Sequence, residues 1–386
     1  MGNILVLDVE TTTSNKGNPF DQTNKCVCVG VKWKMADGNS WKPVILYDDF
    51  SSLQEIINRA SLVVGFNIKF DLHWLRKIGI DISNVRVWDC QLAEFILNNQ
   101  KTPYPSLDDA AIKYGFPKKL DVVKTEYWDK GIDTDKIPKN ILSEYLSQDL
   151  ILTQQVFEKQ WEIFKTDKRL PLFKLQCLDL LVLEEMEYNG ILFNTEEALK
   201  KAATIEKELD GIYKDISISI GGIPINLSSN DHVSALLYGG HITEDIRIPV
   251  GVYKSGEKIG QVRNKILTKE YILPRIVEPL EGTEVKKSTP ENPYWEVNET
   301  TLRSLKVTKE AKKIITLLDN YGKLEKLRGT YLEGYAKLID KMNWPKNMLY
   351  GTLNQCVAIT GRLSSSKPNL QNADPATKVF METQYG

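Results

Sequence analysis

The segment ILVLDVETT (residues 4–12) decides how the N-terminal part of the chain folds. It opens with aliphatic residues typical of a buried strand, and Asp8 and Glu10 follow where that strand is expected to end. Side chains two positions apart in a strand point to the same face, so both carboxylates meet the solvent together. Such a pair can bind a hard cation, although acidic residues at strand ends are also common without one.

Further strands and helices are expected after this segment. Short apolar runs predict the strands, and apolar residues at helical spacing predict the helices between them. The strands are expected at residues 26–33, 43–47 and 61–67, and the helices at 51–60, 71–79, 89–99 and 142–166. Strands surrounded by helices predict an α/β domain with a mixed sheet, covering residues 1–168.

The rest of the chain is mostly helical. A helical pattern starts at residue 170 and ends on Asn189-Gly190, a helix-stop signal. We expect a helical region over residues 169–346, interrupted at residues 241–293 by a Gly- and Pro-containing insertion with a hairpin-like or extended form. Residues 347–386 form a third, short part.

Composition excludes several classes of protein. The 50 Lys and Arg nearly balance the 51 Asp and Glu, so net charge alone predicts no nucleic-acid partner. Residues 301–346 carry eleven basic and five acidic residues, which suits either a solvated helix face or a phosphate-binding surface. The five cysteines and three histidines lack zinc-site spacing, and no apolar run has the length of a membrane span. A reducing compartment without membrane attachment is expected.

Two further motifs carry acidic residues in the first domain. In GFNIKFDLHWL (residues 65–75), Asp71 stands at the expected start of a helix, where it either caps that helix or adds a ligand. In EYLSQDLILTQQVF (residues 144–157), Tyr145 and Asp149 are one helical turn apart on the same face, which also suits ordinary core or surface positions. Together the motifs supply four carboxylates, enough for two divalent ions.

The ordered set LDVETT, FNIKFD and YLSQD resembles the three motifs of the DEDD exonuclease superfamily, tyrosine subtype (DEDDy), which has a ribonuclease-H-like fold. The resemblance implies a 3′–5′ proofreading exonuclease that hydrolyses DNA 3′ ends with two Mg²⁺ or Mn²⁺ ions. It implies metal ligands at Asp8, Glu10, Asp71 and Asp149, a water-orienting hydroxyl at Tyr145, and contacts to the single strand from Asn67 and Phe70.

The segment QCVAITGRLSSSKPNLQN (residues 355–372) is similar to the start of the palm in family A DNA polymerases, and residues 318–335 are similar to the preceding thumb helix. The resemblance implies a mostly helical thumb region followed by the beginning of a palm, in a bacterial or phage protein of the cytoplasm. Contacts to primer–template DNA are expected from Arg362, Gln371 and Asn372 and from the thumb residues Lys323, Lys326 and Arg328.

The sequence departs from this family at its end. The chain stops at Gly386, and nothing in it matches the family's catalytic palm aspartates, so this chain alone is not expected to polymerise DNA. We therefore expect a separate palm and fingers chain, as in a split polymerase, or a missing C-terminal continuation. Two other functions stay open, namely a non-catalytic DNA-binding assembly subunit and an RNA-trimming nuclease.

Overall fold

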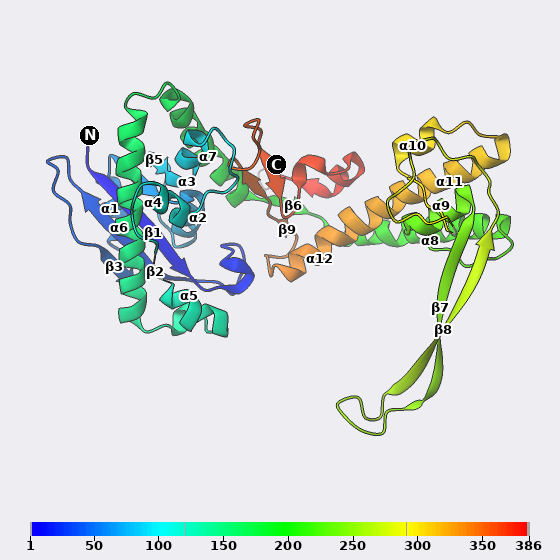
Figure 1. Cartoon of the computed structure of the whole chain (residues 1–386). Helices are drawn as coiled ribbons and strands as arrows, with labels where there is room; N and C mark the ends of the chain where they lie inside the picture. The colour runs from blue at the N-terminus through cyan, green and yellow to red at the C-terminus, as the bar shows by residue number, and fades with distance from the viewer. Residues whose placement is uncertain (1, 120, 291, 384–386) are drawn as a thin grey trace. The chain divides into compact units, whose positions relative to one another are not determined.

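The computed structural model of the chain describes residues 2–119, 121–290 and 292–383 (Figure 1). It contains two compact units. Unit 1 joins Met1–Thr195 with Tyr335–Gly386, and unit 2 is Glu196–Gly334. Each unit has a hydrophobic core of its own.

A five-stranded mixed sheet in the order β3-β2-β1-β4-β5 forms the centre of unit 1. Strands β3, β2 and β1 are antiparallel neighbours, whereas β1, β4 and β5 run parallel. The strands are β1 (Ile4–Thr11), β2 (Cys26–Lys34), β3 (Val44–Tyr47), β4 (Leu62–Gly65) and β5 (Val87–Asp89). The expected ribonuclease-H-like α/β fold is confirmed. Strand β5 was not expected, because three residues are too few to show an alternating pattern.

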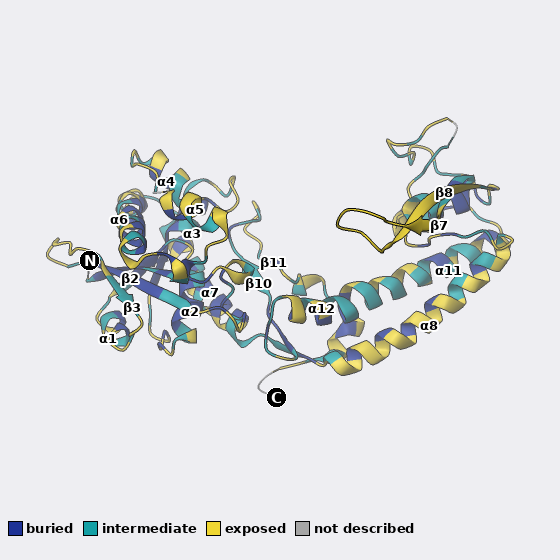
Figure 2. Ribbon diagram, turned by 90° about the horizontal axis from the view of Figure 1, so that it is seen from below, coloured by how far each residue is buried: buried dark blue, intermediate teal, exposed yellow. Residues whose placement is uncertain are grey.

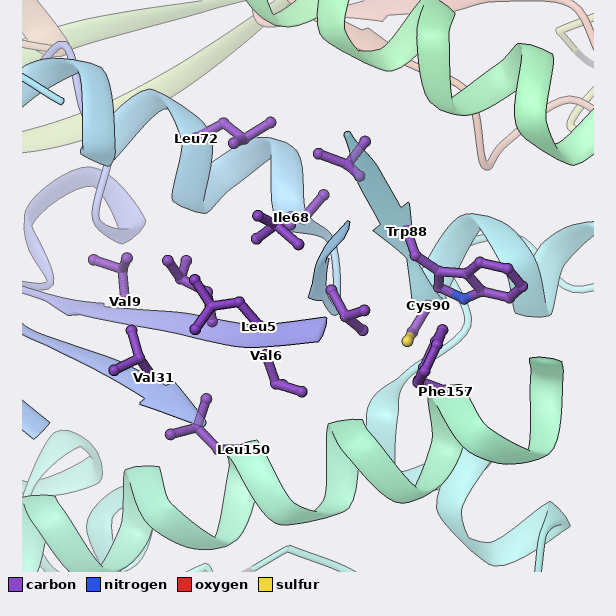
Figure 3. Close-up of a cluster of buried hydrophobic side chains, with 14 of the residues drawn as sticks. Leu5, Val6, Val9, Val31, Ile68, Leu72, Trp88, Cys90, Leu150 and Phe157 are labelled. Carbon is purple, nitrogen blue, oxygen red and sulfur yellow. The ribbon is translucent and has the colours of Figure 1, made fainter. Parts of the chain in front are cut away.

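Helices cover both faces of this sheet (Figure 3). Leu5 and Val9 of β1 point toward helix α2, and Val6 points toward helix α6 on the opposite face, as alternation along a strand requires. Gly30 of β2 lies beside Asp8, and a Cβ at Gly30 would come within 2.8 Å of side-chain atoms of α6. Glycine at this position therefore lets α6 lie close to the sheet. The helices are α1 (Leu53–Asn58), α2 (Ile68–Lys77), α3 (Cys90–Leu97), α4 (Leu107–Lys113), α5 (Val122–Glu126), α6 (Lys139–Phe164) and α7 (Leu170–Asn189).

The C-terminal residues complete unit 1 with two small sheets. One has the order β12-β6-β9, so a strand that follows α7 pairs with strands close to the C-terminus. The other is the pair β10-β11. These elements are β6 (Ile191–Phe193), β9 (Met348–Leu349), β10 (Thr352–Asn354), β11 (Ser364–Ser366), β12 (Met381–Glu382) and helix α12 (Glu333–Lys341). Short 3₁₀ turns are η1 (Ser14–Lys16), η2 (Trp128–Lys130), η3 (Thr134–Lys136), η5 (Leu370–Asn372) and η6 (Pro375–Phe380).

Unit 2 combines helices with one long hairpin. Its helices are α8 (Thr195–Ser219), α9 (Asn230–Tyr238), α10 (Glu299–Ser304), α11 (Lys309–Glu325) and the π-helical η4 (Lys326–Leu332). The hairpin joins β7 (Gly240–Val252) to β8 (Val262–Leu273), within the insertion expected from the sequence, and it is exposed along most of its length (Figure 2). Among the residues described, no helix is both long and apolar enough to cross a bilayer.

Candidate metal centre

Asp8 and Glu10 of β1 and Asp149 of α6 form one group, in which each offers a carboxylate oxygen within 4.8 Å of the others. Asp8 and Glu10 are two and four positions after Val6 in the strand, so their side chains lie on the same face as that of Val6, which α6 covers. Asp149 extends from α6 toward them. The strand is longer than the expected Ile4–Asp8, because β1 continues to Thr11, and the pair lies within its last four residues.

The electrostatics of the group favour a bound cation. Burial, followed by the charge of Asp149, raises the pKa of Asp8 to about 7. Burial and the charges of Asp8 and Asp149 raise the pKa of Glu10 well above its usual value. Within the described residues, Asp149 Oδ1 is buried without a hydrogen-bond partner. Crowded carboxylates with an unsatisfied oxygen are the hard donors that Mg²⁺ and Mn²⁺ prefer, so the residues fit such ions.

Asp71 is not one of the three residues of this group, although its carboxylate and that of Asp8 both accept from the backbone N–H of Val9. It lies in the first turn of α2, on the other face of the sheet, and its Oδ1 accepts a hydrogen bond of 2.9 Å from the backbone N–H of Val9. Burial, followed by the charge of Asp8, raises the pKa of Asp71 well above normal. Asp71 therefore lies next to the cluster, while its carboxylate is turned to the strand backbone.

Lys119, which sequence reasoning missed, contacts both residues of the third motif. Its Nζ lies 2.8 Å from Tyr145 Oη and 2.9 Å from Asp149 Oδ2. Burial alone lowers the pKa of Lys119, but Asp149 and Tyr145 outweigh it and raise that pKa above its usual value. Burial and the charge of Asp149 also raise the pKa of Tyr145, so its phenol stays neutral. A lysine in a loop gives no sequence signal for a contact thirty positions away.

Asn67 and Phe70 line a cavity of about 300 Å³, together with Gln91 and Tyr104. Asn67 has a left-handed backbone (φ 60°), which asparagine adopts more readily than most residues. Its position depends on Asp89, whose carboxylate accepts backbone hydrogen bonds from Asn67 and Ile68 and also caps α3. The half-exposed Tyr104 was not identified from the sequence.

The residues expected to contact duplex DNA lie elsewhere. Arg362, Gln371 and Asn372 are exposed in the C-terminal part of unit 1. In unit 2, Lys323 pairs with Asp319 at 2.6 Å, and Arg328 pairs with two glutamates, Glu325 at 2.9 Å and Glu333 at 2.7 Å. Two of the three thumb cations therefore already have carboxylate partners, and all of these DNA contacts remain predictions.

Two family models match parts of this chain. Residues 5–164 match the family model for the 3′–5′ exonuclease, and residues 269–383 match that for DNA polymerase family A. The first match contains all four carboxylates and Tyr145. The second contains Arg362, Gln371 and Asn372.

Similar proteins are DNA polymerases of bacteria and phage. DNA polymerase I of Bacillus subtilis is 24% identical over 77% of this chain and 28% of its own length. The DNA polymerase of Bacillus phage SP01 is 23% identical over 96% of this chain and 43% of its own length, so the chain spans less than half of either protein.

A solved structure shows the same fold. The POL domain of Pol1 from M. smegmatis, in complex with DNA primer-template and dNTP, has a TM-score of 0.61 at 15% identity over 98% of this chain and 54% of that one. The chain therefore carries a 3′–5′ exonuclease domain at residues 5–164 and a segment of DNA polymerase family A at residues 269–383.

Proposed function

We propose that this chain is the proofreading part of a DNA polymerase and hydrolyses the terminal phosphodiester of a DNA 3′ end, releasing a nucleoside 5′-monophosphate. The observation that carries the proposal is the group of Asp8, Glu10 and Asp149 within 4.8 Å of one another, inside a domain that matches the 3′–5′ exonuclease family. Two divalent ions at this site would supply an activated water and stabilise the departing 3′ oxygen.

Each side chain has a part in this reaction. Asp8, Glu10 and Asp149 would hold the ions, and Asp71 would supply the fourth carboxylate if its side chain turned from the β1 backbone. Tyr145 orients the attacking water as a neutral hydrogen-bond donor, since its raised pKa makes it unsuitable as a base.

The nearby cavity suits the last nucleotide of the strand. Asn67 has polar groups for hydrogen bonds, and the rings of Phe70 and Tyr104 offer surfaces on which a base can stack. The duplex behind the 3′ end would contact Arg362, Gln371 and Asn372, together with the thumb residues Lys323, Lys326 and Arg328.

The proposed working unit also contains a palm and fingers, on a partner chain or on a continuation of this one, and acts in the cytoplasm of a bacterium or an infected bacterial cell. Unit 1 has apolar surface that such a partner could cover. Five exposed residues recur along one face of α7, namely Leu172, Leu175, Leu178, Val182 and Met186. Met186 also borders a mostly apolar cavity of about 740 Å³ beside β9 and β12. This chain alone is proposed not to polymerise.

A non-catalytic DNA-binding assembly subunit is the second candidate. The complete set of four carboxylates and Tyr145 argues against it, because a scaffold has no need to keep buried, mutually repelling acids. An RNA-trimming nuclease would not need the polymerase segment at residues 269–383.

One assay separates the three functions. A mismatched DNA primer–template and an RNA oligomer are each incubated with the chain and Mg²⁺, with Asp149→Asn as the matched control. We expect the DNA 3′ end to shorten one nucleotide at a time and the RNA to remain. No degradation of either substrate supports the assembly subunit, whereas preferred degradation of RNA supports the RNA nuclease.

A further inference from the structure

The hairpin of β7 and β8, here called the ribbon (residues 240–273), joins the core of unit 2 at its base through Ile242 and Leu273 and has solvent on both faces over residues 245–270. Its strands pair continuously from Gly240 opposite Leu273 to Val252 opposite Val262, with one irregularity near Pro249. Nearly all residues from 245 to 270 are exposed (Figure 2). A two-stranded hairpin without a covered face is only marginally stable in water, so a partner surface is expected for it.

The distal part of the ribbon is strongly basic. Residues 247–269 contain six cations and a single acid, Glu257. The cations are Arg247, Lys254, Lys258, Arg263, Lys265 and Lys269. None of the six forms an ion pair with a carboxylate in the part of the chain that the structure describes, whereas Lys200, Lys287 and Arg303 of the same unit do. Three further acids, Glu244, Asp245 and Glu270, flank this stretch nearer the base. The excess positive charge therefore lies in the distal part of the ribbon, where a polyanion can neutralise it.

The cations follow the geometry of the strand. Arg263, Lys265 and Lys269 are separated by even numbers of residues in β8 and therefore share one face. They extend over about 20 Å at the usual rise of a strand. Ile246 and Leu267 lie opposite each other on the same face, so apolar side chains alternate with the cations, and Glu244 lies opposite Lys269 at the end nearer the base. A two-stranded ribbon fits the major groove of duplex DNA, where cations meet phosphates and apolar groups meet thymine methyls.

We propose that the ribbon is a binding element for duplex DNA that acts through phosphate contacts of its distal cations. The proposal rests on the proposed function, which makes duplex DNA a substrate of the chain. A protein partner would also suit the exposed aliphatic residues. The excess of five positive charges over residues 247–269 favours a polyanion instead.

The test measures the salt dependence of duplex binding. Binding of a fluorescent blunt-ended DNA duplex is followed by anisotropy in EDTA, which prevents hydrolysis, over a series of salt concentrations. The test variant is Arg263→Gln with Lys265→Gln and Lys269→Gln. The matched control is Lys200→Gln with Lys287→Gln and Arg303→Gln, which removes three cations that already have carboxylate partners in unit 2.

We expect the test variant to bind duplex DNA less tightly. The slope of log binding constant against log salt concentration should become shallower by about 0.9 for each phosphate contact removed, and by up to about 3 in all. The control variant should keep the wild-type slope. A second variant in the loop, Lys254→Glu with Lys258→Glu, leaves the strands intact and is expected to reduce the slope as well. Wild-type affinity and slope in both ribbon variants would overturn the proposal.

Hydrolysis of a short single-stranded DNA with Mg²⁺ is measured in parallel. Wild-type rates in the ribbon variants, combined with weaker duplex binding, support the ribbon as a separate element. A wild-type chain that hydrolyses nothing, while its ribbon variants still lose duplex affinity, contradicts the proposed function and leaves the ribbon proposal standing.

Discussion

Lys119 Nζ lies 2.9 Å from Asp149 Oδ2 in the carboxylate cluster. In the absence of metal, this ammonium group compensates part of the negative charge of the cluster. The other oxygen of the carboxylate, Asp149 Oδ1, is buried without a hydrogen-bond partner among the described residues. A metal ion that approaches Asp149 is repelled by the same ammonium group. Lys119 is therefore expected to stabilise the metal-free site and to weaken metal binding.

Replacing Lys119 by Met tests this expectation. Loss of the nearby positive charge should tighten Mn²⁺ binding on the order of tenfold and lower the Tm of the metal-free protein. Isothermal titration calorimetry measures the first effect and scanning calorimetry the second. Lys118→Met, at the exposed neighbouring position, is the matched control and should change neither. Mn²⁺ affinity that is unchanged or weaker in Lys119→Met contradicts this role for Lys119.

The double substitution Asp8→Ala with Glu10→Ala should abolish hydrolysis without unfolding the protein. The variant lacks two of the proposed ligands. In the wild type these buried carboxylates repel each other and Asp149, which is one cause of the raised pKa of Glu10. Without this repulsion, the Tm of the metal-free protein should stay the same or rise. Gel analysis of a labelled 3′ end and calorimetry of the same sample check both statements. Degradation at the wild-type rate would show that these residues are not the ligands.

Tyr145→Phe should slow the chemical step by about 10² to 10⁴, because only the hydroxyl that is proposed to orient the water is lost. Affinity for single-stranded DNA should stay at the wild-type value, since the ring remains. Single-turnover rates with saturating enzyme isolate this step. If these rates equal those of the wild type, Tyr145 serves packing alone.

The stability of the metal-free protein should depend on pH. The pKa of Asp8 is raised to about 7, mainly by burial, so the folded state binds a proton that the unfolded state releases near pH 4. The free energy of unfolding is therefore expected to decrease as the pH rises from about 4 to about 7. Calorimetry in EDTA should show this decrease in the wild type and a smaller one in Asp8→Asn. Saturating Mg²⁺ should stabilise the protein most at neutral pH. An identical pH profile in Asp8→Asn would contradict the raised pKa.

Much of this site could be predicted from the sequence, because its main elements have strong local patterns. The alternation in residues 4–10 places Asp8 and Glu10 on one face, and the helical spacing of Tyr145 and Asp149 places both on the side of α6 that faces the sheet. The family motifs then brought the three segments together.

Other features depend on tertiary contacts and could not be predicted. Lys119 comes from a loop between α4 and α5, and neither its type nor its spacing indicates that it contacts α6. The hydrogen bond from Val9 to Asp71 depends on how α2 packs against β1. The carboxylate partners of Lys323 and Arg328 lie within one or two helical turns, a spacing that permits ion pairs but does not require them.

The most direct test of the two-metal exonuclease is a single-turnover assay of a 5′-labelled primer with a mismatched 3′ end, run on the wild type and on Asp149→Asn. The wild type is expected to shorten the primer stepwise with Mg²⁺ and not at all in EDTA, and Asp149→Asn is expected to be about 10³-fold slower. Equal rates in the two proteins, or a wild type that leaves the primer intact with Mg²⁺ or Mn²⁺, would contradict it.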